Sequence, residues 1–279
     1  MQTKVHHASL IIDDPLLREN YGYLNYRKLL SLMDKHNFFT TIAFIPWNYN
    51  RTDKNIAALF RERPDRFSLC VHGCDHTKGE FGRTDIQHLD NIVKLATARM
   101  IEHEKKTGIP FDRVMVFPQG VFTNEALEAL KKNKYLAAVN TEPLPVDGPL
   151  SSNFPFYLRY TPEDALNYCT NPAFIVLHHN YFKNGYERLT NFIDEVNAHS
   201  KNIKWDSVGN SIRHYVPTCE VNNDPADVDL TGLNFHGYEE SVKILLRRYA
   251  SEFRDNYLCR NDYLLNWAKK IKVIQHHWS

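Results

Sequence analysis

The first half of the chain alternates short β-branched or aromatic runs with amphipathic helical stretches. Strands are predicted at residues 5–12, 40–47, 67–71 and 114–117. Helices are predicted between them at residues 26–36, 54–63 and 84–106. Strands separated by helices favour a parallel sheet with crossover helices, so the pattern predicts an α/β fold.

Local signals set the ends of several elements. Thr84 is a plausible cap for the long helix, which should stop before Gly108, and Thr123 should cap the helix after the fourth strand. Pro162 is expected as the first residue of another helix. The remaining elements are predicted as strands at residues 135–139, 156–160 and 174–177, a helix at 186–198 and a short element at 205–208.

Composition excludes several function classes. The 279 residues carry a formal net charge of +1, which argues against a nucleic-acid groove or a polybasic membrane patch. No apolar run approaches the length of a membrane span, and the amino terminus lacks the apolar core of a signal peptide. Five cysteines are an odd number for a disulfide framework, so we expect free thiols in a reducing compartment and a cytoplasmic location.

The chain is predicted to divide near residue 215. Residues 217–234 are polar and rich in turn-forming residues, and a helix is predicted behind them at 238–253. We therefore expect one main domain at residues 1–215 and a helical carboxy-terminal extension at residues 216–279. The extension could pack on the main domain or on a second subunit, and the sequence leaves the oligomeric state open.

Two histidines four residues apart, His72 and His76, directly follow the third predicted strand. Imidazole is the commonest metal ligand in proteins, and this pair needs only a carboxylate to form a three-ligand site with an open position. Asp13 and Asp14 follow the first strand and could supply it. Adjacent carboxylates repel each other unless a cation or metal offsets the repulsion, although capping of the turn at Pro15 explains them equally well.

Two further features end predicted strands. The turn at residues 116–120 could aim backbone N–H groups at an oxyanion, or it could simply connect a strand to a helix. His178 ends the strand at residues 174–177, where a histidine is more often hydrogen-bonded than catalytic. All four features nevertheless fall at carboxyl ends of strands, where α/β barrels build their active sites.

Taken in order, these features resemble the motifs of the NodB-like polysaccharide deacetylases, a carbohydrate esterase family with a deformed (β/α) barrel. The family's Thr-Phe-Asp-Asp-Gly-Pro motif is similar to residues 11–15, and its paired histidines are similar to His72 and His76. Its Arg-x-Pro-x-Gly motif falls on residues 116–120, and its Leu-x-His motif falls on residues 176–178. The resemblance covers roughly residues 5–215.

The resemblance implies a metal-dependent hydrolase that removes an acyl group, usually acetyl, from a sugar or polysaccharide precursor. It implies that Asp14, His72 and His76 bind a divalent metal, usually zinc. Asp13 would be the general base and His178 the general acid. The backbone N–H of Gln119 would donate to the oxyanion, and the substrate would be a carbohydrate or an acylated small molecule.

The sequence departs from the family pattern at two points. The glycine of the first motif is absent, so Pro15 directly follows Asp14 and the loop must take another path. Val116 stands where the family has the arginine that orients the base. The substitutes are Arg18, Arg113 and Arg159, of which we favour Arg159 because it ends a predicted strand.

Three alternatives remain at this level. The scaffold could hydrolyse small non-sugar amides, as the altered third motif suggests. It could be a pseudoenzyme that keeps the metal and has lost the chemistry. A compact zinc site could instead use Cys70 and Cys74 with the two histidines, although this spacing is tighter than that of ordinary structural zinc motifs.

Overall fold

The structure is a computed structural model that describes residues 5–165, 170–199 and 202–215, together with 233, 246, 249, 250, 252–254 and 257. The predicted division at residue 215 and the predicted helix at 238–253 therefore lie almost wholly outside the described residues. None of the helices within the described ranges is long and apolar enough to cross a membrane.

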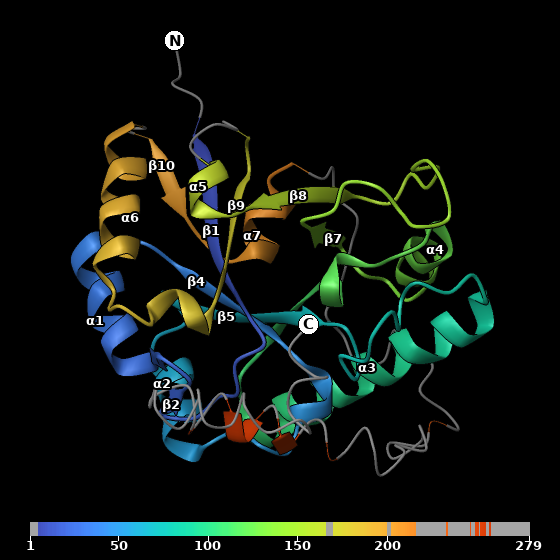
Figure 1. Cartoon of the computed structure of the whole chain (residues 1–279), viewed down its shortest axis with the longest axis horizontal. Helices are drawn as coiled ribbons and strands as arrows, with labels where there is room; N and C mark the ends of the chain where they lie inside the picture. Colours follow the sequence, from blue (N-terminus) through green and yellow to red (C-terminus); the bar gives the residue numbers. More distant parts are fainter. Residues whose placement is uncertain are drawn as a thin grey trace, which may run out of the picture.

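Seven parallel strands close into a barrel, which Figure 1 shows surrounded by helices. In barrel order they are β1 (His6–Asp13), β4 (Thr40–Phe44), β5 (Phe67–His72), β6 (Phe111–Val116), β7 (Ala137–Asn140), β8 (Phe156–Tyr160) and β9 (Ala173–His178). The barrel closes where β1 pairs with β9, in a register that runs from Ala8↔Ala173 to Asp13↔His178. An eighth strand, β10 (Ile203–Trp205), pairs with the start of β1. The predicted α/β class and deformed barrel are confirmed.

The helices lie around the barrel, except the last, which fills one of its ends. They are α1 (Tyr26–His36), α2 (Lys54–Glu62), α3 (Ile86–Thr107), α4 (Asn124–Lys132), α5 (Pro162–Ala165), α6 (Glu187–His199) and α7 (Val208–Arg213). Figure 1 shows α1 and α6 on one side of the barrel and α3 and α4 on the other. Thr123 caps α4 and Gly108 ends α3, as predicted. The predicted cap of α3 at Thr84 is wrong, because Asp85 accepts the N–H groups of Gln87 and His88.

The structure differs from the sequence-based elements at three places. The strand predicted at residues 40–47 stops at Phe44, because the proline of the 3-10 helix η1 (Pro46–Asn48) lacks the N–H that a strand ladder needs. The element predicted at 205–208 divides into the end of β10 and the start of α7. The hairpin of β2 (Asn20–Tyr21) and β3 (Leu24–Asn25) has strands too short to show any periodicity.

The side chains of β1 alternate between two apolar layers. Leu10 and Ile12 join the large core that packs the barrel against the helices. Ile11 joins a smaller cluster inside the barrel, whose end is filled by Val208 and Ile212 of α7. Because side chains along a strand alternate in direction, Asp13 points to the same interior as Ile11. The same alternation on β5 carries the interior face from Cys70 to His72.

Candidate active site

Asp13 and His178 meet because the last residues of β1 and β9 are paired in register. The Asp13 side chain is only 2% exposed, whereas that of His178 is 53% exposed. His178 Nε2 lies 3.9 Å from Asp13 Oδ2 and 4.0 Å from Asp14 Oδ2. The pair therefore places a buried carboxylate beside an imidazole that solvent and a substrate can reach.

Arg159, on β8, supplies the cation for Asp13. Its Nη1 donates to Asp13 Oδ1 over 2.6 Å, and both side chains are almost fully buried. Burial opposes ionisation of Asp13, but neighbouring positive charge, that of Arg159 foremost, holds the pKa of Asp13 below its usual value. Of the three predicted substitutes for the missing arginine, Arg159 is the one that contacts the predicted base.

Asp14 turns the chain away from the barrel at φ 75°. A left-handed conformation is uncommon for a non-glycine residue, and it costs on the order of 1–3 kcal/mol. Asp14 thus makes the turn after β1 without a glycine, and Pro15 follows it directly. Its Oδ1 comes to lie 3.1 Å from both His72 Nε2 and His76 Nε2.

His72 is the last residue of β5, and its ring is held by the neighbouring strand. Its Nδ1 lies 2.9 Å from the carbonyl oxygen of Val116, the residue that pairs with it in register. A carbonyl can only accept, so Nδ1 carries the proton and Nε2 of the neutral ring keeps a free lone pair. Metal-ligating histidines typically have this second hydrogen bond.

His76 lies on the loop after β5, in the left-handed region at φ 57°. Its ring centroid is 4.9 Å from that of His72. Its Nδ1 has a long contact, 3.4 Å, with Nε2 of Gln119. The His76 ring is therefore held less firmly by side-chain contacts than the His72 ring.

The Asp14, His72 and His76 side chains fit a divalent cation. Their ligand atoms lie within 4.8 Å of one another, and in the part of the chain that the structure describes they form the only such cluster of three or more His, Cys, Asp or Glu residues. Asp14 Oδ1 is buried and has no hydrogen-bond partner, although two imidazole nitrogens face it. A cation between these electron pairs would satisfy all three atoms, and a bidentate or water ligand could complete the shell.

The predicted oxyanion turn forms the 3-10 helix η2 (Pro118–Gly120) after β6. The amides of Gly120 and Val121 donate to the carbonyls of Phe117 and Pro118. Proline has no N–H, so the amide of Gln119 is the turn's candidate donor. Gln119 is exposed and adopts φ 54°, and its side chain reaches His76.

The alternative zinc site with two cysteines is wrong for this fold. Cys70 and Cys74 are free thiols, and both are buried in apolar clusters. Burial raises the pKa of Cys70 well above its usual value, which opposes the thiolate that zinc requires. The strand also ends at His72, so the alternation that would align four ligands stops there.

Glu80 is a buried carboxylate at this site that the motifs did not identify. It is 7% exposed and accepts backbone N–H groups from the loop that carries His76. Burial raises its pKa, with the amides of Cys74 and Asp75 opposing the rise. The spacing of Thr77 and Glu80 resembles a capping box, and this was the available signal.

No protein-family model and no curated protein matches the sequence. The structure is similar to a candidate polysaccharide deacetylase from Mycobacterium smegmatis, with a TM-score of 0.55 and 13% identity over 77% of this chain and 92% of that one. It is also similar to a family 4 carbohydrate esterase from Bacillus anthracis, with a TM-score of 0.50 and 19% identity over 76% of this chain and 84% of that one. The chain has the fold of the family 4 carbohydrate esterases. The resemblance inferred from the motifs is thus confirmed at the level of the fold.

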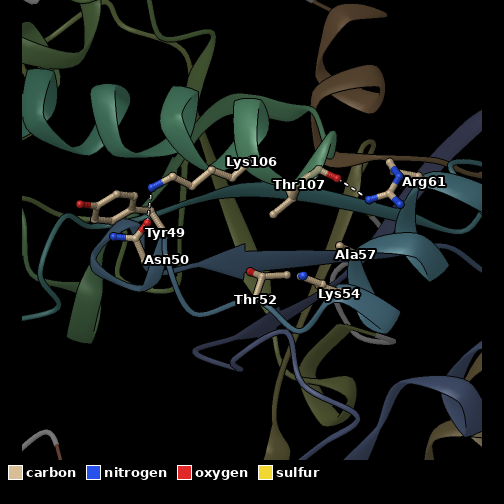
Figure 2. A pocket seen from close by; sticks show the side chains of 8 residues that line it. All are labelled: Tyr49, Asn50, Thr52, Lys54, Ala57, Arg61, Lys106 and Thr107. Atoms are coloured by element: carbon tan, nitrogen blue, oxygen red, sulfur yellow. Dashed lines mark hydrogen bonds between the residues drawn. The ribbon is translucent and has the colours of Figure 1, made fainter.

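A cavity of about 400 Å³ lies outside this site (Figure 2). Its lining comes from α2, from the loop before α2 and from the last turn of α3: Tyr49, Asn50, Thr52, Lys54, Ala57, Arg61, Lys106 and Thr107. In Figure 2, Lys106 reaches Asn50 and Arg61 reaches the carbonyl of Thr107. None of these lining residues is among the residues predicted for the active site.

Proposed function

We propose that this protein is a metal-dependent hydrolase that removes an N- or O-acyl group, acetyl foremost, from a sugar or polysaccharide precursor. One observation carries the proposal. A three-residue cluster that fits a metal lies beside a buried Asp–Arg pair and an exposed histidine, at the carboxyl ends of the strands of one barrel. The proposal of a carbohydrate substrate is supported by the likeness to a candidate polysaccharide deacetylase and to a family 4 carbohydrate esterase.

Asp14, His72 and His76 would hold the cation, which we propose to be zinc. When bound, such a cation acts as a Lewis acid toward the scissile carbonyl and lowers the pKa of water. Asp13 Oδ2 and His178 Nε2 lie 3.9 Å apart, and His178 Nε2 lies 4.0 Å from Asp14 Oδ2, so an acyl group bound at this cluster would be next to both proton-transfer groups.

Asp13 is proposed to accept the proton of the attacking water. Its Oδ1 is occupied by Arg159, so Oδ2 is the oxygen available for this transfer. The pKa of Asp13 is lowered, so the carboxylate is ionised at neutral pH and can act as the base.

His178 and Gln119 are proposed to complete the reaction. Water adds to the acyl carbon, and the Gln119 amide donates to the oxygen on which negative charge develops. His178 Nε2 then protonates the leaving nitrogen or oxygen as its bond to the acyl carbon breaks. The products are a free carboxylic acid and an amine or hydroxyl group on the sugar.

The pair of Arg159 with Asp13 favours an active enzyme over a pseudoenzyme. Val116 stands where the motif of the resembled family has an arginine, but the Arg159 guanidinium contacts Asp13, so the proposed base still has a cationic partner. Burying two charges costs free energy, so a buried pair at this position is better explained by a role in the site than by stability alone.

Acyl release is the test of this proposal. Zinc- or cobalt-loaded protein is incubated with N- and O-acetylated sugars and oligosaccharides, and with small ureide and imide compounds, and released acid or amine is measured. We expect release from sugars, and a rate lowered about 10²- to 10⁴-fold by Asp13→Asn with metal content unchanged. Turnover of the ureides or imides alone would support the small-amide alternative. No release from any compound, or an Asp13→Asn rate equal to wild type, would contradict the proposed chemistry.

A further inference from the structure

The loop between β5 and α3 holds one of the three candidate ligands without the support of a strand. His72 lies on β5, and its ring is tied to the carbonyl of Val116. His76 lies on the loop in a left-handed conformation, and its Nδ1 has a long contact, 3.4 Å, with Gln119 Nε2. The ring of His76 contacts Asp14 and His72, but these contacts do not hold its backbone, so the loop backbone must be held by other groups.

Glu80 makes the contacts that could do this. Its Oε1 accepts the N–H groups of Cys74 over 2.9 Å and of His76 over 3.2 Å. Its Oε2 accepts the N–H groups of Asp75 over 3.0 Å and of Thr77 over 3.4 Å, and the Thr77 hydroxyl over 3.4 Å. One buried carboxylate thus binds four consecutive backbone amides that include the amide of the ligand itself.

The space for this carboxylate exists because residue 73 is glycine. A Cβ built on Gly73 would lie 2.2 Å from Glu80 Oε1 and 2.4 Å from the Pro118 ring. The Glu80 carboxylate therefore fills the place that a side chain at position 73 would take, between the loop and the turn that carries Gln119.

A second buried contact holds the same loop from α3. Arg99 Nη1 donates to Asp75 Oδ1 over 2.5 Å, and it lies 3.4 Å from Cys74 Sγ. Asp75 thus binds α3 through its side chain while its amide binds Glu80. The loop is fixed on both sides, and neither contact uses the imidazole of His76.

We propose that Glu80 is a positioning residue for the metal site, which holds the His76 backbone so that Nε2 meets Asp14 and His72. This inference rests on the proposed function, because it takes these three residues as metal ligands. Mutation of a residue that hydrogen-bonds to a metal ligand and orients it typically lowers metal affinity about 10- to 100-fold. Glu80 would do so through backbone amides instead of a ring nitrogen.

Titration of the metal-free full chain with Co²⁺ tests the inference, with Zn²⁺ affinity measured by competition. Glu80→Gln keeps the size of the side chain but replaces one accepting oxygen with an NH₂ group. We expect Zn²⁺ to bind about 10- to 100-fold more weakly and the visible Co²⁺ spectrum to change, because the coordination geometry changes. Glu80→Asp keeps the charge but is one methylene too short to reach all four amides, so it should also bind more weakly.

Asp112→Asn is the matched control for a loss of stability. Asp112 is also a buried carboxylate that accepts a backbone amide, that of Gly209 over 3.1 Å, but it lies at the opposite end of β6 from the site. Asp112→Asn should lower thermal stability and leave Zn²⁺ affinity and the Co²⁺ spectrum as in wild type.

The outcomes separate the inference from the proposed function. If wild type binds no metal, both fail. If wild type binds metal and Glu80→Gln matches it in affinity and spectrum, the inference alone is overturned. If Glu80→Gln does not fold, Glu80→Asp decides by the same titration, and an unchanged affinity in it overturns the inference.

Discussion

At the scale of single residues, the ion pair of Arg159 with Asp13 joins β8 to β1, and no sequence pattern predicts that these two residues meet. The sequence favours Arg159 only because it ends a predicted strand. That it reaches Asp13 depends on the barrel, since β8 and β1 are separated by β9 and both side chains point into one interior. Val116, on β6, stands where the Arg-x-Pro-x-Gly motif has its arginine. It is apolar and packs with Ile11 and Cys70.

Removing the guanidinium should destabilise the protein strongly. Arg159→Gln leaves a buried carboxylate without its partner, so we expect the free energy of unfolding to fall by about 3 kcal/mol in urea denaturation. Arg188→Gln is the control, because Arg188 pairs with Glu163 on the surface and should change the free energy of unfolding by less than about 1 kcal/mol. An equal loss in the free energy of unfolding for the two variants would contradict the assignment of a strong stabilising role to the buried Arg159–Asp13 pair.

His103 gives the protein a pH-dependent stability that does not involve the site. It is fully buried on α3, its ring centroid is 4.7 Å from that of Phe44, and its Nε2 lies 2.8 Å from Thr52 Oγ1. Burial lowers the pKa of His103 from 6.5 to about 4. The unfolded chain therefore binds the proton more readily, and the stability present above the unfolded pKa is lost as the pH falls toward the folded pKa.

The predicted loss is measurable between pH 6.5 and 4. Protonation of His103 should lower the free energy of unfolding by about 3 kcal/mol across this range. His103→Gln, which cannot titrate, should remove that part of the pH dependence, and the difference between the two urea-denaturation profiles isolates it. Parallel profiles for wild type and variant would contradict the assignment.

At the scale of elements, long helices and strands were predictable because their periodicity is strong, and short ones were not. The predicted strand at residues 156–160 coincides with β8, and the predicted helix at 26–36 coincides with α1. The strands of the β2–β3 hairpin have two residues each, so no periodic pattern predicts them, yet the hairpin packs beside the candidate site. Tyr21 makes an edge contact with His179, the residue after His178.

Gly22 in this hairpin is predicted to be intolerant of a side chain. It has φ 56°, and a Cβ there would lie 2.1 Å from His179 Nδ1. Gly22→Ala should lower the free energy of unfolding by about 1 kcal/mol for its backbone and a further 1–3 kcal/mol for the clash. It should also lower acyl release, because displacing His179 moves His178.

Gly79→Ala is the control for the backbone contribution. Gly79 has a similar φ of 67°, but nothing lies within 4 Å of a Cβ there. It should therefore show only the cost of about 1 kcal/mol in thermal or urea unfolding. If the two alanine variants lose the same stability and Gly22→Ala keeps its activity, the contact with His179 is unimportant.

At the scale of the whole molecule, the order of motifs along the chain predicted the barrel because each motif ends a strand. Parallel strands bring their carboxyl ends to one rim, so Asp13, Asp14, His72, Gln119 and His178 had to approach one another once the barrel closed. The register of β1 with β9 and of β5 with β6 decides their distances, and no sequence pattern specifies it. The sequence motifs did not identify Glu80, because its partners are backbone amides and no residue type marks them.

Metal content of the purified full chain tests the proposed site most directly. Elemental analysis of wild type, His72→Ala and His76→Ala should find about one equivalent of a divalent metal in wild type only. Both variants should also melt at lower temperature than metal-loaded wild type, because a bound metal stabilises only the folded state. Wild type without metal, or both variants with a full equivalent, would contradict the assignment of Asp14, His72 and His76 as the metal site.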